Sequence, residues 1–360
     1  METTTDGTTT EDRKATPRWA RWAAYAASAW SLVYGGLGLH WARGGAGFPF
    51  GEGDIPDARA ESLLGGATAS GTAPVIAAAG FAGAALALVM ARVRLRGPAR
   101  VAVLAMAWSL AVTLVALVPD ARIMIAVGYA PIVLAGLPFG WPDVDYVEVA
   151  LPWPVLNLII CLAVGLLWAG AALAFQRRTG DSCGGCGRSA RGSAGWTTPV
   201  SAAGWGRWAA YTAFAVPLFY AVVRWAWVLN IPLLFPEEGL RRLHESGLVW
   251  AGAGLATFAA AGGVLTLGLV HRWGEIWPRW VIGLAGRRVP PALPVALASV
   301  VTAVLLSAGA QVVRGTDWTD PVAWLSSPMA YWPIWAVALG LATLAYHLRR
   351  RGRCRYCGLV

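Results

Sequence analysis

Long apolar runs, separated by short polar or charged segments, make up most of the chain from residue 22 onward. Each run holds roughly 18 to 24 largely uncharged residues, close to the roughly 20 that a helix needs to cross the hydrocarbon layer of a membrane. Lipid cannot satisfy exposed backbone groups, and the alternating pattern of a membrane β-barrel is absent. The pattern therefore predicts an all-α integral membrane protein. The nine runs cover residues 22–41, 72–91, 101–118, 123–140, 155–175, 208–228, 248–270, 292–313 and 329–346.

An internal duplication organises these runs. The segment Arg-Trp-Ala-Ala-Tyr occurs at residues 21–25 and again at residues 207–211, an offset of 186 positions. The same offset superposes Tyr34 on Tyr220 and Trp41 on Trp227 without a gap. The predicted organisation is a disordered cytoplasmic tail at residues 1–18, a first transmembrane repeat at 19–187, a cytoplasmic linker at 188–204 and a second transmembrane repeat at 205–360.

Charge indicates which ends of the runs share a side of the membrane. Most basic residues lie in the N-terminal tail, the turn at residues 92–100, the central linker, the loop at residues 272–288 and the C-terminal tail. By the positive-inside rule these five segments, including both chain termini, should be cytoplasmic. The loops around residues 52–61, 143–148 and 237–245 are richer in acid and should face the exterior, although Arg43, Arg59, Arg241 and Arg242 weaken the contrast.

This sidedness favours eight crossings, because nine would put the basic linker on the opposite side from the N-terminal tail. The run that we exclude from the membrane crossings is 123–140. It contains Gly128, Pro131, Gly136 and Pro138 and lies between acidic segments. We expect it to form a re-entrant or interfacial hairpin on the external side, packed in protein or beside a wet cavity. Each repeat then crosses four times, and the repeats are parallel.

Composition narrows the class of protein further. The chain is 57% hydrophobic and 13% charged, with 21 tryptophans and a net charge of +10. The first 18 residues lack the apolar core of a secretory signal peptide. Arginine and tryptophan alternate at residues 272–280, as expected of a segment in the headgroup layer. We therefore expect membrane lipids as partners, and no nucleic acid.

Two Cys-x-x-Cys-Gly segments carry the most specific chemistry. Cys183 and Cys186 end the first repeat, and Cys354 and Cys357 end the second. Four thiolates are the ligand set of a tetrahedral structural zinc ion, and the expected cytoplasmic location keeps thiols reduced. One site shared by the two ends would tie the repeats together. The alternatives are unligated thiols and, less favoured, a redox dithiol. Cys161 lies in an apolar run and is expected to be a packing residue.

Three polar residues inside the runs are candidates for substrate binding, because ionisable and polar groups in a membrane are often functional. Arg224 lies among Val223 and Trp225 near a predicted helix end, where it can alternatively snorkel to the interface or pair with an external glutamate. His40 lies beside Trp41 at a similar depth and can alternatively serve a structural role. The third candidate is Asn157, which can alternatively make an interhelical hydrogen bond.

The external acids form a weaker candidate. Asp143, Asp145 and Glu148 are closely spaced oxygen donors for a divalent cation, but they lack the order of a calcium loop, and solvated loop charge explains them as well. The chain contains no phosphate-binding glycine loop with its lysine, no His-Glu-x-x-His segment and no nucleophile elbow. Enzymes that carry these motifs are therefore disfavoured.

The Arg-Trp-Ala-Ala-Tyr helices, the Phe-Gly-Trp-Pro segment at residues 139–142 and the arginine-flanked Cys-x-x-Cys-Gly ends together resemble uncharacterised polytopic membrane proteins of high-GC actinobacteria. This resemblance implies a bacterial cytoplasmic membrane and supplies no reaction or catalytic residue. Lys14 is the only lysine, which agrees with a high-GC genome.

Three hypotheses for function remain open. The first is a membrane protein that binds or moves a small or lipidic molecule between its repeats. The second is an intramembrane enzyme that acts on a hydrophobic substrate through external acids and His40. The third is a structural or assembly module whose cysteines fix partner contacts. A polar cavity that reaches both faces would favour the first hypothesis, and a closed pocket where His40 meets a carboxylate would favour the second. A filled bundle with no cavity would favour the third.

Overall fold

The computed structural model describes residues 17–139, 148, 150–188, 195–279, 281–317, 319–320 and 327–359. Within these residues the chain is helical, and the one extended pairing is an isolated antiparallel bridge between Ile276 and Arg288. The predicted disordered tail lies almost wholly outside this part, as do Asp143 and Asp145. The prediction of an all-α protein is confirmed for the described chain.

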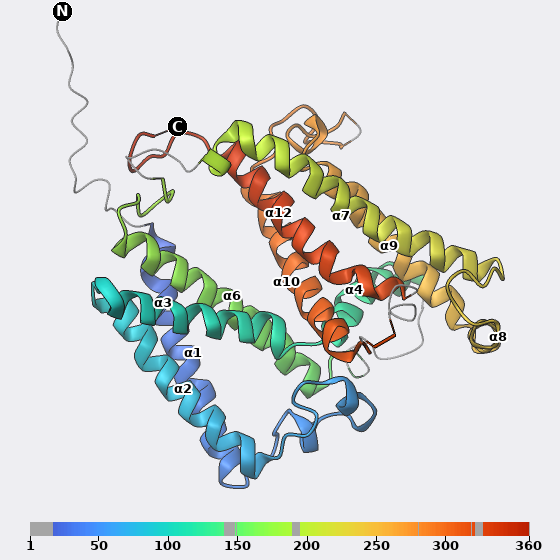
Figure 1. The fold of residues 1–360 in the computed structure, drawn as a ribbon, viewed down its shortest axis with the longest axis horizontal. Coiled ribbons are helices and arrows are strands. Elements are labelled where there is room, and N and C mark those ends of the chain that lie inside the picture. Colours follow the sequence, from blue (N-terminus) through green and yellow to red (C-terminus); the bar gives the residue numbers. More distant parts are fainter. Residues whose placement is uncertain are drawn as a thin grey trace, which may run out of the picture. The chain divides into compact units, whose positions relative to one another are not determined.

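The described residues form ten α-helices, of which nine follow the nine predicted runs, while α8 lies in a segment that was expected to be an acidic loop (Figure 1). They are α1 (Arg18–Ala42), α2 (Ala69–Arg92), α3 (Gly97–Val112), α4 (Ala121–Gly136), α6 (Trp153–Thr179), α7 (Pro199–Val228), α8 (Glu237–Glu245), α9 (Leu248–Leu267), α10 (Ala292–Gly315) and α12 (Trp332–Arg350). Shorter turns are η2 (Gly51–Gly53), η3 (Pro56–Glu61), η4 (Thr113–Leu117), η5 (Leu137–Phe139), η6 (Gly195–Thr197), η7 (Arg272–Gly274) and η8 (Pro328–Tyr331), of which η4 continues α3 as a π-turn.

Local sequence explains where several helices begin. Thr68 caps α2 by accepting a hydrogen bond from the N–H of Gly71 at 3.2 Å, and Thr198 caps α7 through Ser201 at 3.3 Å. A proline stands at the start of α3 and of α7, where its missing N–H costs nothing.

Seven helical segments are long and apolar enough to cross a membrane: α2, α3 with η4, α6, α7, α9, α10 and η8 with α12. These helices fit a multi-pass membrane protein. The helix α1 has 25 residues but is not among the seven, since arginines and small polar residues dilute its apolar content. The eighth predicted crossing therefore stays a prediction that depends on α1.

Contacts divide the chain into two compact units whose boundaries interleave along the sequence. Unit 1 comprises residues 1–118, 156–194 and 351–360, and unit 2 comprises residues 119–155 and 195–350. The predicted boundary after residue 187 lies near residue 194, where the second segment of unit 1 ends. The segment 119–155, however, packs with unit 2, and the last ten residues, 351–360, pack with unit 1.

Unit 1 is a bundle in which α1, α2, α3 and α6 surround one apolar core. Ser28 of α1 donates to the carbonyl of Ala84 in α2 at 2.9 Å, while Gly38 lies against Ala77, so these helices run antiparallel. Arg100 at the start of α3 donates to Thr179 at the end of α6 at 2.8 Å. The four helices therefore alternate in direction, and their arginine-bearing ends lie together.

Glycines let α1 and α2 approach closely. A Cβ atom at Gly80 would lie 2.5 Å from the Cα atom of Gly35, and one at Gly38 would lie 2.6 Å from the backbone nitrogen of Ala77. Such backbone contact is the usual way in which membrane helices gain dispersion energy without a hydrophobic driving force.

Unit 2 has the same alternation in α7, α9, α10 and α12. Gly206 of α7 contacts Ala345 of α12, whereas Tyr220 contacts Trp332, so α7 and α12 are antiparallel. Gly309 of α10 lies against Pro333 at the start of α12, which makes that pair antiparallel as well. The last turn of α12 and the arginine-rich loop after α9 lie at the same end, where Arg350 pairs with Glu275 at 3.3 Å.

The segment predicted as a broken hairpin forms the helix α4, which continues through Gly128 and Pro131. Its apolar part, Ala121–Ala130, is shorter than a membrane span. Gln311 of α10 accepts a hydrogen bond from the N–H of Ala121 at 2.6 Å and secures the first turn. Contacts with neighbouring helices stabilise this helix where the sequence suggested a break.

Candidate metal centre and apolar cavities

The first cysteine pair follows the end of α6 in a tight turn. The N–H of Gly187 donates to the carbonyl of Cys183 at 2.8 Å, and the N–H of Cys183 donates to the carbonyl of Arg188 at 2.8 Å. Gly187 has a φ of +76°, in the left-handed region that glycine adopts without a steric penalty. The glycine after the second cysteine is therefore required by the turn.

The second pair repeats this turn. The N–H of Gly358 donates to the carbonyl of Cys354 at 2.9 Å, and the N–H of Cys354 donates to the carbonyl of Leu359 at 3.0 Å. Gly358 has a φ of +68°. The two Cys-x-x-Cys-Gly segments therefore have the same backbone hydrogen bonding, and they present two equivalent pairs of thiols.

The two turns meet within unit 1. The Sγ atoms of Cys183 and Cys354 are 3.9 Å apart, those of Cys186 and Cys357 are 3.6 Å apart, and all four lie within 4.8 Å of one another. Four sulfurs at about 2.3 Å from a tetrahedral zinc ion stand about 3.8 Å from each other. The donor set and its spacing therefore fit zinc. Four protein ligands leave no open position for catalysis, so such an ion would be structural.

Arg188 fastens the second turn to the first. Its guanidinium donates to the carbonyls of Gly352 at 3.0 Å, Arg351 at 3.1 Å and Leu359 at 2.8 Å. Gly185 completes the fit, since a Cβ atom there would lie 2.4 Å from the ring of Tyr356. Sequence reasoning missed Arg188, because an arginine beside a cysteine pair has the same appearance as any solvated basic residue.

Electrostatics at the cluster favour thiolate at one position. Burial opposes ionisation of Cys354, but hydrogen bonds from the backbone N–H groups of Tyr356 and Cys357 outweigh it and lower the pKa of this thiol to about 7. Burial raises the pKa of Cys357 to about 12. Arg177, whose guanidinium lies beside Gly187 and donates to the carbonyl of Gly185 at 3.0 Å, adds positive charge that suits an anionic metal–thiolate centre.

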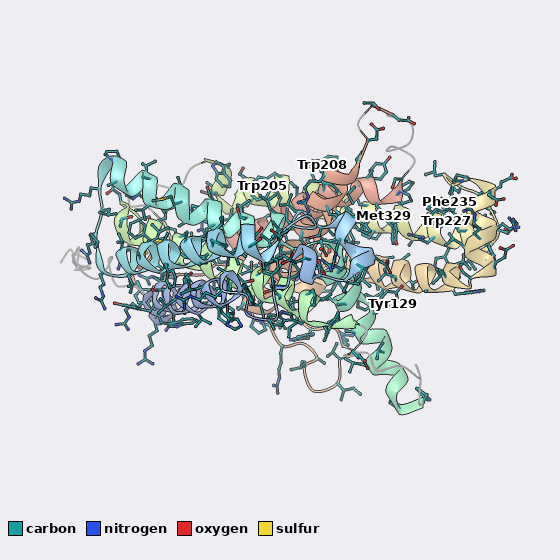
Figure 2. All side chains as sticks on the ribbon, turned by 90° about the horizontal axis from the view of Figure 1, so that it is seen from below. Tyr129, Trp205, Trp208, Trp227, Phe235 and Met329 are labelled. Carbon is teal, nitrogen blue, oxygen red and sulfur yellow. The ribbon has the colours of Figure 1, made fainter. Side chains whose placement is uncertain are left out.

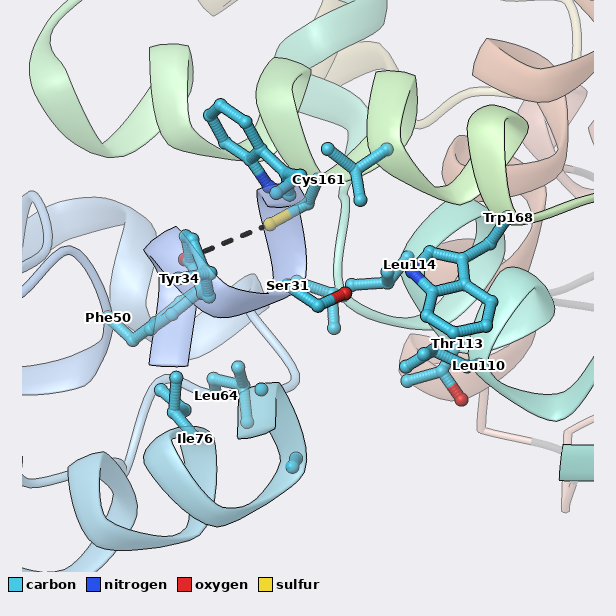
Figure 3. Close-up of a pocket in the computed structure, with 15 residues that line it drawn as sticks. Ser31, Tyr34, Phe50, Leu64, Ile76, Leu110, Thr113, Leu114, Cys161 and Trp168 are labelled. Carbon is cyan, nitrogen blue, oxygen red and sulfur yellow. Dashed lines mark hydrogen bonds between the residues drawn. The ribbon is translucent and has the colours of Figure 1, made fainter. Parts of the chain in front are cut away.

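A cavity of about 210 Å³ lies inside unit 1, among α1, α2, α3 and α6 (Figure 3). Its wall is almost wholly apolar. The residues that define it include Ile76, Leu110, Leu114 and Trp168, with Tyr34 and Cys161 on one side.

Asn157 stands at the polar side of this cavity region but does not line it. Its Oδ1 accepts a hydrogen bond from the hydroxyl of Tyr34 at 2.7 Å, and the same hydroxyl lies 4.0 Å from the Sγ of Cys161. Asn157 is fully buried. It makes an interhelical hydrogen bond between α6 and α1, as the structural alternative predicted, and Cys161 is a buried packing residue.

A larger cavity, of about 360 Å³ and open to the surface, lies in unit 2 among α9, α10, α12 and the loop after α9. Its wall includes Leu339 and Trp335 and the exposed side chains of Leu265, Leu297 and Val301, and Trp273 lines it from the loop. The indole Nε1 of Trp335 is shielded from solvent and makes no hydrogen bond within the described chain.

The ends of α9 and α12 hold that loop in place. Tyr346 donates to the carbonyl of Gly274 at 3.1 Å, and Arg350 donates to the carbonyl of Val289 at 3.3 Å. A Cβ atom at Gly268 would lie 2.7 Å from the ring of Trp273, so this glycine allows the loop to fold back over the cavity.

The structure places the other sequence candidates apart from these cavities. His40 is exposed, and its imidazole makes no hydrogen bond to any described residue. The guanidinium of Arg224 lies over the rings of Tyr220 and Trp227 in unit 2. No described ion pair joins Arg224 to Glu237 or Glu238. Of the external acids around residue 145, only Glu148 belongs to the described chain, where it is helical.

No protein-family model, curated protein or solved structure matches this chain.

Proposed function

We propose that this chain is a multi-pass membrane protein that binds a lipidic molecule in the apolar cavity of unit 2. The observation that carries the proposal is the cavity of about 360 Å³, which is bounded by long apolar helices and lined almost wholly by apolar side chains. Largely apolar cavities with few polar groups are typical of ligand sites. The sequence suggested a ligand between the repeats, whereas this proposal places it within one unit.

The loop after α9, which lines one side of the cavity, supports an amphiphilic ligand. It carries exposed arginines at positions 272, 279, 287 and 288, next to exposed apolar residues such as Ile282, which is 98% exposed. A loop with both characters suits the headgroup layer of a membrane. An acyl or isoprenoid chain would fill the cavity while its polar end stays near these arginines.

The alternating helices support eight crossings with both termini in the cytoplasm. In each unit the arginine-bearing ends of four helices lie together, as the positive-inside rule requires if every one of them spans the membrane. This arrangement includes α1 as a crossing and leaves α4 as a non-spanning helix on the external side. A bacterial cytoplasmic membrane is the location that the sequence resemblance implies.

Zinc at the four cysteines would serve this architecture by fixing the C-terminal segment to unit 1. Its role would be structural, since it would join residues 351–360 to the end of α6 without an open coordination position.

A cavity-filling substitution tests the proposed ligand site. Ala298 lines the cavity and Ala296, on the same helix, is exposed and does not, so Ala298→Trp and Ala296→Trp are matched variants. Each protein is purified in detergent, and bound lipids are extracted and identified by mass spectrometry. We expect a lipidic molecule with the native chain and with Ala296→Trp, and its loss with Ala298→Trp. Equal retention by Ala298→Trp, or no retained molecule in the native protein, would contradict the proposal.

The enzyme hypothesis has less support. It required a closed pocket where His40 meets a carboxylate, and the exposed imidazole of His40 has no such neighbour among the described residues. The assembly hypothesis required a filled bundle, whereas both units contain cavities. The first hypothesis expected a polar cavity that reaches both faces, whereas the two described cavities are apolar. The geometry therefore supports binding of a lipidic molecule and gives no support for moving a polar solute.

A further inference from the structure

Arg224 occupies a place at which the two repeats have diverged. The offset that superposes Tyr34 on Tyr220 and Trp41 on Trp227 puts Gly38 at the position of Arg224. In unit 1 the rings of Tyr34 and Trp41 contact each other edge to face, with centroids 5.8 Å apart. There Gly38 lies so close to α2 that no side chain fits. The second repeat has therefore gained a cation beside a duplicated aromatic pair.

The guanidinium of Arg224 is held by ring faces instead of by an anion. Its Cζ atom is 5.1 Å from the ring centroid of Tyr220 and 4.5 Å from that of Trp227. The position of Trp227 is itself fixed, since its indole N–H donates to the carbonyl of Leu233 at 2.8 Å and its ring packs against Phe235 at 4.5 Å (Figure 2). This aromatic cradle orients the cation before any ligand binds.

The charge of Arg224 has no counter-charge within the described chain. Its Nε is shielded from solvent and makes no hydrogen bond. Two of the three glutamates of the nearby helix α8 are engaged elsewhere, because Glu238 pairs with Arg241 at 2.9 Å and Glu245 pairs with Arg241 at 2.6 Å. The third, Glu237, forms no described ion pair with Arg224. A partly desolvated cation without an anion is costly, and an anionic ligand would remove that cost.

The surroundings favour a ligand that is anionic at one end and apolar at the other. On the α9 side, the guanidinium lies close to the helix backbone at Gly252. A Cβ atom built on Gly252 would lie 3.4 Å from Nη1 of Arg224. On α7 itself, Val222, Trp225 and Leu229 are exposed apolar neighbours that acyl chains can cover. Arginine suits phosphate because its planar fork can donate two parallel hydrogen bonds.

We infer that Arg224, between Tyr220 and Trp227, is a binding site for the phosphate of an anionic phospholipid. The site lies beside the start of α9, whereas the cavity of unit 2 begins at Gly262 near the end of that helix. It is therefore separate from the proposed cavity ligand and stands independently of it.

The test compares variants in nanodiscs of phosphatidylcholine with and without phosphatidylglycerol. Arg224→Met removes the guanidinium and keeps an unbranched apolar side chain. Arg242→Met removes an exposed arginine of the nearby helix α8 and leaves the pairs of Arg241 with Glu238 and Glu245 in place. The readouts are the thermal midpoint and the number of phosphatidylglycerol molecules retained in native mass spectrometry. We expect phosphatidylglycerol to raise the midpoint of the native chain and of Arg242→Met. Arg224→Met should lose the rise, with an affinity about tenfold or more lower.

Two additional experiments complete the test. The first distinguishes phospholipid from free phosphate, and the second applies if Arg224→Met does not fold. Inorganic phosphate alone should give no shift in the native chain, and a shift equal to that from the lipid would overturn the assignment to phospholipid. If Arg224→Met does not fold, Arg224→Lys and Arg224→Gln replace it. Retention by lysine with loss in glutamine supports the site, whereas equal lipid binding by native, lysine and glutamine proteins overturns it.

Discussion

The hydroxyl of Tyr34 donates a 2.7 Å hydrogen bond to Oδ1 of Asn157, and it joins two helices whose sequences lie 123 residues apart. Asn157 is fully buried, so this bond satisfies a side chain that would otherwise be desolvated without a partner. We expect Tyr34→Phe to lower the free energy of unfolding by about 0.6 to 1.7 kcal/mol, the range for hydrogen bonds between membrane helices. Thermal unfolding in detergent measures the loss.

Tyr25→Phe is the matched control for that substitution, because Tyr25 lies on the same helix and is 45% exposed. Its unfolding midpoint should stay near that of the native chain. A midpoint for Tyr34→Phe that equals the control would show that the bond adds nothing to stability.

Metal content tests the cysteine cluster directly. Purified native protein should contain about one zinc ion per chain, and Cys354→Ser with Cys357→Ser should contain none, because two thiolates cannot complete the tetrahedron. Inductively coupled plasma mass spectrometry on freshly reduced protein gives the ratio. Cys161→Ser, which alters the buried cysteine outside the cluster, should keep its zinc. A native protein without zinc would show that the four cysteines do not form a zinc site.

Arg188 should strengthen metal binding without touching the metal. Its three hydrogen bonds hold the backbone around the second cysteine pair, and loss of such supporting contacts typically lowers metal affinity about 10- to 100-fold. We expect Arg188→Ala to release zinc to a chromophoric chelator at correspondingly lower chelator concentration. Arg355→Ala removes the same charge from an exposed side chain beside Cys354 and should behave as the native chain does. Equal release from both variants would assign the effect to charge alone.

Alanine substitutions at two glycines, one in α1 and one in α2, should have different effects on the free energy of unfolding. Gly80→Ala places a Cβ atom 2.5 Å from the Cα of Gly35 and should destabilise unit 1 by about 1 to 3 kcal/mol through forced separation of the helices. Gly36→Ala meets nothing within 4 Å and should be neutral or stabilising. Chemical denaturation in mild detergent compares them. Similar stability of the two variants would mean that the close approach is not needed.

Single cysteines introduced into loops test the proposed sidedness. Asp57 lies in η3, and Arg96 precedes α3, and both are exposed. In intact cells a membrane-impermeant maleimide should label Asp57→Cys and should leave Arg96→Cys unlabelled until the cells are opened. Labelling of both, or the reverse pattern, would contradict the eight-crossing topology.

Sequence periodicity and residue type were enough to predict nine of the described helices, their arginine-bearing ends and the cysteine chemistry. Runs of apolar residues specify helices because every backbone group in lipid needs a partner within the helix. The repeated Cys-x-x-Cys-Gly predicts one shared site because both copies need the same left-handed glycine and supply the same ligands, and the structure brings all four sulfurs together. These features depend on local periodicity and on residue type.

The grouping of segments into the two units could be seen only in the folded chain. The helix α4 packs in unit 2 although it lies in the first half of the chain, and residues 351–360 pack in unit 1 although they end the second. Nothing local marks Tyr34 as the partner of Asn157. Nor does the sequence show that Gly38 packs against α2 whereas Arg224 lies over two aromatic rings. The cavities, the hydrogen bonds of Arg188 and the unpaired charge of Arg224 depend on which helix faces meet. That choice is made by shape and packing between residues far apart in sequence.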